Sequence, residues 1–158
     1  MIAELGAFAL ALALALSLAQ AFLSAAARLR RSPVLAAAGE GAAIAAATCV
    51  ALAFAALLHA FVVSDFSVAN VAANSHTAKP MLYKVAGTWG SHEGSMLLWC
   101  LALTGFGAAM AGSARGLPAG LKAVAVAVQG ALGSVFLAYT VFAYNPLARL
   151  VQPPVEGR

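Results

Sequence analysis

The residues best suited to chemistry lie together in one short segment, residues 89–99, which reads WGSHEGSMLLW. His92 brings an imidazole and Glu93 a carboxylate to the start of an otherwise apolar run. An ionisable side chain in or beside hydrocarbon is unfavourable even on lenient insertion scales, so such groups in membrane proteins usually have a function. The pair could bind a metal ion or haem, carry a proton or cation, or hydrogen-bond at the start of a helix.

These three interpretations use the residues differently. Neutral imidazole is a common ligand of metals and haem, and an adjacent acid can orient a neighbouring group. Glu93 alone is the candidate carrier in a small transporter. In the third interpretation Ser91 caps a helix and Glu93 faces the positive end of its dipole. No HExxH or HxxxH spacing occurs, so the metal signal is weak and the sequence leaves all three open.

Aromatic residues and glycines surround this pair. If the helix extends back to Trp89, a rotation of about 100° per residue places four side chains on one face. They are Trp89, His92, Met96 and Trp99. Gly87, Gly90 and Gly94 would form a separate strip, which could accept a neighbouring helix or an extended ligand such as a porphyrin, lipid or quinone. The candidate site residues are Trp89, His92, Glu93 and Trp99, on a surface for haem or a partner protein.

Composition places this segment in a membrane protein. Hydrophobic residues make up 63% of the 158 residues and charged residues only 9%. A helix needs about 20 apolar residues to cross about 30 Å of hydrocarbon. Four runs meet this requirement, at residues 2–27, 35–63, 93–112 and 121–144. The sequence therefore predicts an all-α polytopic protein, a single transmembrane bundle over residues 1–158 with four membrane-spanning helices.

The order of charges predicts the orientation of these helices. Glu4 stands at the front of the first run, whereas Arg28, Arg30 and Arg31 follow it. This order differs from that of a cleaved signal peptide, which begins with a basic segment. Short loops rich in Arg and Lys stay in the cytoplasm, which places the amino terminus outside, and Arg115 and Lys122 flank a second inner loop.

Two polar segments are then expected on the outer side, which the resemblance described below implies is the periplasm. The connector, residues 64–92, suits short helices lying on the outer leaflet, with Pro80 starting or breaking one of them. Residues 145–158 are expected to form an extended, truncated loop with nothing to pack it. His59, near the outer end of the second run, is a possible neighbour of His92, whereas His76 is expected to be solvated and inert.

Other classes of chemistry have little support in the sequence. Cys49 and Cys100 stand singly in different apolar runs, as buried small hydrophobic residues often do. No CxxC or CxxCH motif occurs, so neither a thiol relay nor a covalent haem attachment is expected in this chain. The formal charge of +4 is interpreted as topology and attraction to lipid headgroups, and no nucleic-acid partner is expected because no dense basic stripe with aromatic residues is present.

Several motifs together carry a resemblance to a known family. They are residues 64–68 (SDFSV), 71–75 (VAANS), 83–84 (YK) and 89–99, together with 4–6 (ELG), 144–146 (YNP) and 153–154 (PP). In these motifs the chain resembles the amino-terminal portion of the CcmF family (CcmF/NrfE/CcsA type). Members of that family are haem lyase subunits of cytochrome c maturation.

The resemblance implies a larger protein of the bacterial inner membrane. Such a protein takes haem from the haem chaperone CcmE and directs thioether formation at the CxxCH motif of an apocytochrome c presented by CcmH and CcmI. The family holds haem with paired histidines and a Trp-rich external segment beyond the matched region. No haem-ligand role therefore transfers to His59, His76 or His92.

The expected function is thus the amino-terminal membrane scaffold of a cytochrome c haem lyase subunit. It would help to form the periplasmic surface where haem is delivered and attached to apocytochrome c, together with the remainder of the CcmF-like protein and membrane lipid. Haem is expected to be bound by the complete protein. The alternative from a different class is a small proton-coupled membrane transporter that uses Glu93.

Overall fold

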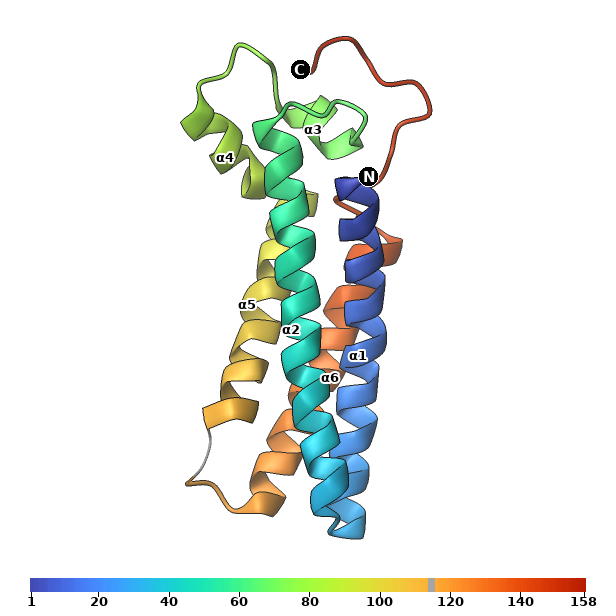
Figure 1. Ribbon diagram of the computed structural model, residues 1–158, viewed down its shortest axis with the longest axis vertical. Coiled ribbons are helices and arrows are strands. Elements are labelled where there is room, and N and C mark those ends of the chain that lie inside the picture. The colour runs from blue at the N-terminus through green and yellow to red at the C-terminus, as the bar shows by residue number, and fades with distance from the viewer. Residues whose placement is uncertain (114–115) are drawn as a thin grey trace.

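A computed structural model describes residues 1–113 and 116–158 of the chain (Figure 1). Regular secondary structure in these two ranges is helical, apart from one isolated antiparallel bridge between Val68 and Arg149. The helices are α1 (Ile2–Arg30), α2 (Pro33–Val62), α3 (Ala69–Asn74), α4 (Met81–Gly90), α5 (His92–Ser113) and α6 (Ala119–Phe142). Arg115, assigned above to an inner loop, lies outside the described residues.

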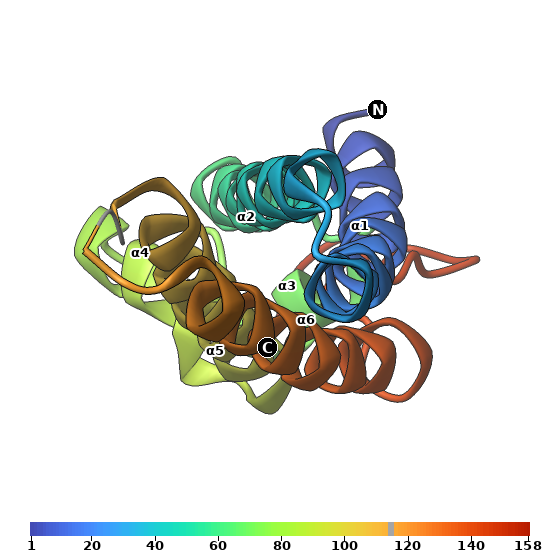
Figure 2. The same cartoon turned by 90° about the horizontal axis from the view of Figure 1, so that it is seen from below.

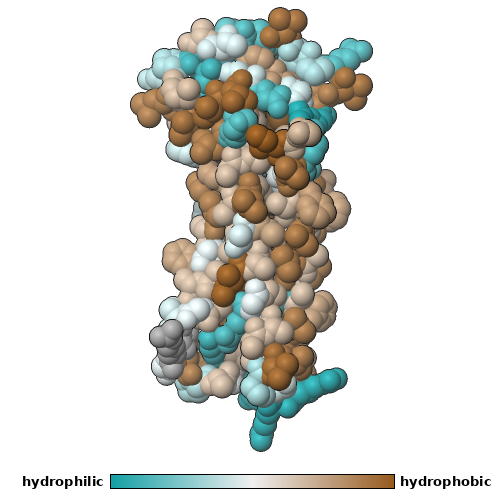
Figure 3. Space-filling model, in the orientation of Figure 1, coloured by the Kyte–Doolittle hydropathy of each residue, from teal (hydrophilic) through white to brown (hydrophobic). Residues whose placement is uncertain are grey.

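Four of these helices form an elongated bundle. α1, α2, α5 and α6 are each long and apolar enough to cross a membrane, which confirms the predicted all-α class with four spans. α1 packs along α2 and α6, and α5 closes the ring by packing along both of those helices (Figure 2). The surface of the bundle is mostly apolar along its length, and polar side chains gather towards its two ends (Figure 3).

Small residues allow α1 and α2 to pack closely. A Cβ on Gly6 would lie 2.6 Å from the Ala56 Cβ, so α1 and α2 touch at this position. The Ala-Leu alternation at residues 9–16 resembles a strand pattern, but its buried positions include Leu10 and Ala13, followed by Ser17, at helical spacing. Lipid provides no hydrophobic force between helices, so close packing of small side chains stabilises this pair.

Two glutamines join three helices in the middle of the bundle. Gln20 of α1 is 1% exposed and donates a hydrogen bond from Nε2 to the Val126 carbonyl of α6 at 2.9 Å, and it also bonds to Gln129. Gln129 in turn donates to the Leu103 carbonyl of α5 at 2.9 Å. A polar group in hydrocarbon needs such partners, so the pair is structural.

One end of the bundle carries the connector between α2 and α5, and we call it the connector end (Figure 1). Pro80 directly precedes α4. The backbone N–H groups of Tyr83 and Lys84, in the first turn of α4, donate hydrogen bonds to the Pro80 carbonyl. The prediction that residues 145–158 have nothing to pack against is wrong. Ala69 donates a backbone hydrogen bond to Ala148 at 2.9 Å, and Leu147 is 3% exposed, so this segment folds back over the connector.

The opposite end carries the turn between α1 and α2, and we call it the arginine end after Arg28, Arg30 and Arg31. α1 ends at Arg30, and Arg31 adopts the left-handed conformation with φ 51°. Ser32 then caps α2, because its Oγ accepts a hydrogen bond from the Leu35 N–H at 3.4 Å. This turn brings α2 back antiparallel to α1.

Candidate functional site

The segment 89–99 contains a break between two helices. α4 ends at Gly90, Ser91 is extended with φ −90° and ψ 164°, and α5 begins at His92. Ser91 Oγ accepts a hydrogen bond from the Gly94 N–H at 3.0 Å, which confirms Ser91 as the cap and leaves Glu93 in the first turn. The Ser91 cap satisfies an N–H group at the start of α5, and the Glu93 carboxylate interacts favourably with the positive end of the α5 dipole.

Gly94 makes this break possible. A Cβ at Gly94 would overlap the backbone carbonyl oxygen of Thr88, so only a glycine lets the end of α4 lie against the start of α5. At Gly90, by contrast, a Cβ would meet no atom within 4 Å. The two glycines of the motif therefore have different roles, and the close approach of backbone to backbone belongs to Gly94.

The break corrects the predicted arrangement of the aromatic residues. The helix does not extend back to Trp89, so Trp89 does not share a helical face with His92, and the predicted glycine strip is also interrupted. Met96 and Trp99 remain on α5 with His92, at a spacing that keeps the three on one face. Trp99 is 66% exposed, which puts this face on the outside of the bundle.

Glu93 lies in a hollow at the connector end. The hollow has a volume of about 340 Å³ and joins α3, the start of α5 and the segment after α6. Its polar lining residues are Asn70, Asn74, Glu93, Tyr144 and Asn145. A carboxylate, three amides and a phenol can bind a hydrogen-bonding group, and the arrangement suits binding rather than bond-breaking chemistry.

One amide nitrogen among the residues that line this hollow has no hydrogen-bond partner in the described part of the chain. Asn74 Nδ2 donates to both Oδ1 and the backbone carbonyl of Asn70, each at 2.9 Å. Asn70 is only 5% exposed, and its own Nδ2 finds no acceptor among the described residues. A buried donor without a partner is unfavourable, so the Asn70 N–H group is the unsatisfied polar group of a residue that lines the hollow.

The three histidines lie in different surroundings. The His92 ring packs edge-on against Tyr144 with 4.5 Å between centroids, while His59 lines an apolar hollow between α1 and α2. His76 lies 3.8 Å from Glu156, so it contacts the folded-back segment. No group of three His, Cys, Asp or Glu side chains that could hold a metal ion occurs in residues 1–113 or 116–158. His92, His59 and His76 thus each have a different neighbour: Tyr144, an apolar hollow and Glu156.

Arg149 fixes the segment after α6 at the connector end. Its guanidinium lies 2.6 Å from a Glu4 carboxylate oxygen and 3.3 Å from an Asp65 oxygen, and it also contacts Ser67 Oγ. Partial burial raises the pKa of Asp65, but hydrogen bonds from Ser67 and the charge of Arg149 together leave that pKa below its ordinary value. Asp65 is therefore ionised at neutral pH.

A second contact holds the last residues. Glu156 accepts hydrogen bonds from the Thr77 N–H at 2.9 Å and from the Thr77 hydroxyl at 2.7 Å. These two bonds, first the backbone N–H and then the hydroxyl, lower the pKa of Glu156. The side chains of Arg149 and Glu156 thus add to the backbone hydrogen bonds that join the connector to the segment after α6.

Sequence analysis missed the amide side of the hollow. Asn70, Asn74 and Asn145 are polar residues at one end of the bundle, but their convergence depends on the path of the connector. The cysteines are both free, and Cys100 is 1% exposed, as predicted for a buried small residue. Cys49 is half-buried and, together with His59, lines the separate apolar hollow between α1 and α2.

The fold defines a multi-pass membrane protein, a bundle of four apolar helices with a polar connector packed over one end. No known sequence-family profile matches the chain. It is 50% identical, over all 158 residues, to the cytochrome c-type biogenesis protein ccl1 of Rhodobacter capsulatus, and covers 24% of that protein. It is 46% identical over 110 residues, 69% of the chain, to CcmF of Escherichia coli, of which the match covers 17%.

A solved structure agrees with these relatives. The cytochrome c haem lyase CcmF superposes on 93% of this chain with a TM-score of 0.87 and 28% identity, and the match covers 25% of that structure. This chain is part of a CcmF-like protein. It spans about a quarter of the length of ccl1 and of the solved CcmF chain.

Proposed function

We propose that this chain is the amino-terminal membrane scaffold of a cytochrome c haem lyase subunit. In this proposal its connector end is part of the periplasmic surface where haem, the substrate, is delivered and attached to apocytochrome c. The observation that carries the proposal is the hollow around Glu93, which the connector, the start of α5 and the segment after α6 build together. The names of the relatives support the same process.

The location of the protein follows from the same proposal. The arginine end would face the cytoplasm of a bacterial inner membrane, because three arginines crowd the short turn between α1 and α2. The amino terminus and the connector would then face the periplasm, where c-type cytochromes are assembled. Partners at this surface would be the remainder of the CcmF-like protein, the haem chaperone CcmE, CcmH and CcmI, and the apocytochrome.

The residues at this surface would have different tasks. Glu93 and the Asn70 amide would hydrogen-bond a polar group of the incoming haem or of a partner. Trp89, 43% exposed, and Trp99, 66% exposed, would offer apolar contact. The His92 ring packs against Tyr144, which lines the hollow. The haem ligands would come from elsewhere in the complete protein.

The test uses the complete CcmF-like protein in cells that lack their own copy. Glu93→Gln removes the charge but keeps the shape, and Asn70→Leu removes the unpartnered amide. We expect each to lower the yield of c-type cytochrome with covalently bound haem by about tenfold, with normal protein levels, because a charged hydrogen bond is lost or a buried donor disappears. Glu40→Gln, at the other end of the bundle, is the matched control.

The contrary result is equally clear. If both variants give the same cytochrome yield as the Glu40→Gln control at equal protein abundance, the hollow only stabilises the fold. The transporter alternative receives no support from the relatives. Substrate-dependent proton flux into proteoliposomes, lost in Glu93→Gln, would be needed to revive it.

A further inference from the structure

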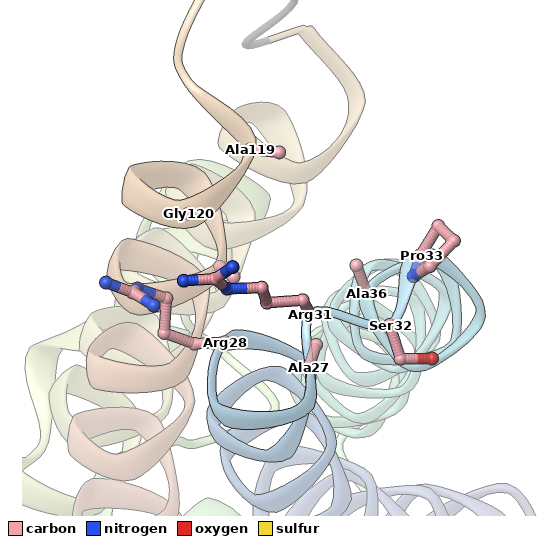
Figure 4. A pocket seen from close by; sticks show the side chains of 9 residues that line it. Ala27, Arg28, Arg31, Ser32, Pro33, Ala36, Ala119 and Gly120 are labelled. Atoms are coloured by element: carbon pink, nitrogen blue, oxygen red, sulfur yellow. The ribbon is translucent and has the colours of Figure 1, made fainter.

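A second hollow lies at the arginine end, away from the Glu93 site (Figure 4). It has a volume of about 340 Å³ and lies where the end of α1, the start of α2 and the start of α6 meet. Arg28 and Arg31 line it, with Ala27, Ala36 and Ala123 among its apolar lining residues. The hollow therefore combines two guanidinium groups with an apolar wall beside the hydrocarbon.

The helices direct both arginines to one side. Figure 4 shows the Arg28 and Arg31 side chains pointing together towards α6, and the Ser32 hydroxyl pointing away from them. Arg28 rests against the first turn of α6, where a Cβ on Gly120 would be 3.4 Å from Arg28 Nε. The left-handed turn at Arg31 brings the second side chain beside the first. Arg30 is not among the residues that line the hollow.

Within residues 1–113 and 116–158, no acidic residue pairs with Arg28 or Arg31. The sequence has five acidic residues, and Glu4, Asp65, Glu93 and Glu156 all belong to the connector end. The remaining one, Glu40, lies 2.9 Å from Lys122 and is already paired. Among the residues that the structure describes, neither Arg28 nor Arg31 has a side-chain hydrogen bond or an ion pair.

We propose that this hollow binds the phosphodiester headgroup of an anionic phospholipid in the leaflet at the arginine end. A guanidinium presents a planar fork of N–H donors that matches phosphate, and two forks can hold one phosphodiester. Basic pockets between membrane helices suit such headgroups, and the alanine wall continues into hydrocarbon, where the acyl chains lie. A free phosphate would use the same donors but not the wall.

The test measures lipid retained by the complete CcmF-like protein. The protein is purified in a neutral detergent, supplied with phosphatidylglycerol or phosphatidylcholine, and bound lipid is counted by native mass spectrometry. We expect about a tenfold preference for phosphatidylglycerol, and loss of that preference in the double variant Arg28→Gln, Arg31→Gln. Arg30→Gln removes one positive charge from the same turn, against two in the double variant, and does not touch the hollow, so it should keep the preference.

Arg31→Gly keeps the test independent of folding. Glycine adopts the left-handed conformation more readily than arginine, so this variant should melt at a higher temperature while it retains less phosphatidylglycerol. If Arg31 had only a structural role, the melting temperature and the amount of retained phosphatidylglycerol would fall together.

Three results would overturn the proposal. The first is an equal loss of retention in Arg30→Gln, which would mean general attraction to a basic surface. The second is full retention in the double variant, as expected if another part of the complete protein fills the hollow. The third is displacement of phosphatidylglycerol by millimolar inorganic phosphate, which would assign the site to the free ion.

Discussion

The two ends of this bundle treat their arginines differently. At the connector end Arg149 contacts Glu4 and Asp65, so its charge is used to hold two segments of the chain together. At the arginine end Arg28 and Arg31 line a hollow and have no carboxylate partner among residues 1–113 and 116–158. An arginine with a carboxylate partner stabilises the fold, whereas two neighbouring arginines without such a partner, at a membrane surface, are available to an external anion.

Buried polar side chains also differ between the middle of the bundle and the connector end in whether they have hydrogen-bond partners. Gln20 and Gln129 are polar groups in the membrane-spanning part, and each finds a backbone carbonyl to bond. Of the buried side-chain atoms without a partner in the described ranges, three lie in the connector, on Asn70, Ser75 and Thr88. Unsatisfied polarity therefore concentrates at the end that we propose meets haem and apocytochrome.

The largest expected effect is at Gly94. Gly94→Ala places a Cβ on the Thr88 carbonyl, so α4 or α5 must shift, and we expect a loss of about 3 kcal/mol in the free energy of unfolding. Gly90→Ala, which meets open space, should change it by less than about 0.5 kcal/mol. Unfolding of the complete protein in mixed detergent micelles measures both. Equal effects would show that the break between α4 and α5 is looser than the structure has it.

The break between α4 and α5, where both glycines lie, shows which local features could be predicted from the sequence and which could not. Ser91 as a helix cap and Glu93 in the first turn follow from local rules, and they were one of the three interpretations that the sequence left open. That Trp89 belongs to a different helix could not be predicted, because the break depends on the contact of Gly94 with Thr88. Helical periodicity alone continues through such a break.

Contacts between distant segments were also beyond the sequence. Thr77 and Glu156 are 79 residues apart, and Gln20 and Gln129 are 109 apart, so their pairing depends on helix rotation and on the path of the connector. The four apolar runs, by contrast, need only length and composition. The fold class was therefore predictable, whereas the hollow around Glu93 and the packing of residues 145–158 were not.

The next largest effect is expected at Arg149. Arg149→Gln removes the cation that Glu4 and Asp65 share, although Glu4 keeps its ion pair with the amino terminus. We expect a loss of about 1 kcal/mol, because the network is partly exposed to solvent. Salt should weaken the difference between the variant and the original protein. Chemical unfolding at low and high ionic strength checks both points. The prediction fails if Arg28→Gln, a matched loss of charge at the arginine end, destabilises the protein as much.

A smaller effect separates the two left-handed residues, one at each end. Arg31 has φ 51° and Ser64 has φ 55°, and glycine suits both positions. Ser64 Oγ accepts a hydrogen bond from Lys84 Nζ at 2.8 Å, so Ser64→Gly gains backbone freedom but loses a bond and should be nearly neutral. Arg31→Gly loses no bond to the described chain and should stabilise by about 0.5–1 kcal/mol in lipid-free neutral detergent. Thermal melting compares the two, and a loss of stability in Arg31→Gly would mean that this side chain supports the fold.

The smallest effect is the response of the connector end to acid. Hydrogen bonds from Thr77 lower the pKa of Glu156, so this contact contributes stability above the ordinary pKa of a glutamate and loses it as the pH falls through the lowered value. Asp65 beside Ser67 and Arg149 behaves in the same direction. Below about pH 4 the segment after α6 should therefore loosen from the connector. The amide resonance of Thr77, in protein labelled at threonine, should shift in this range, and Glu156→Gln should abolish the shift. A midpoint above the ordinary glutamate value would contradict the contact with Thr77, since only a carboxylate bonded in its charged form resists protonation.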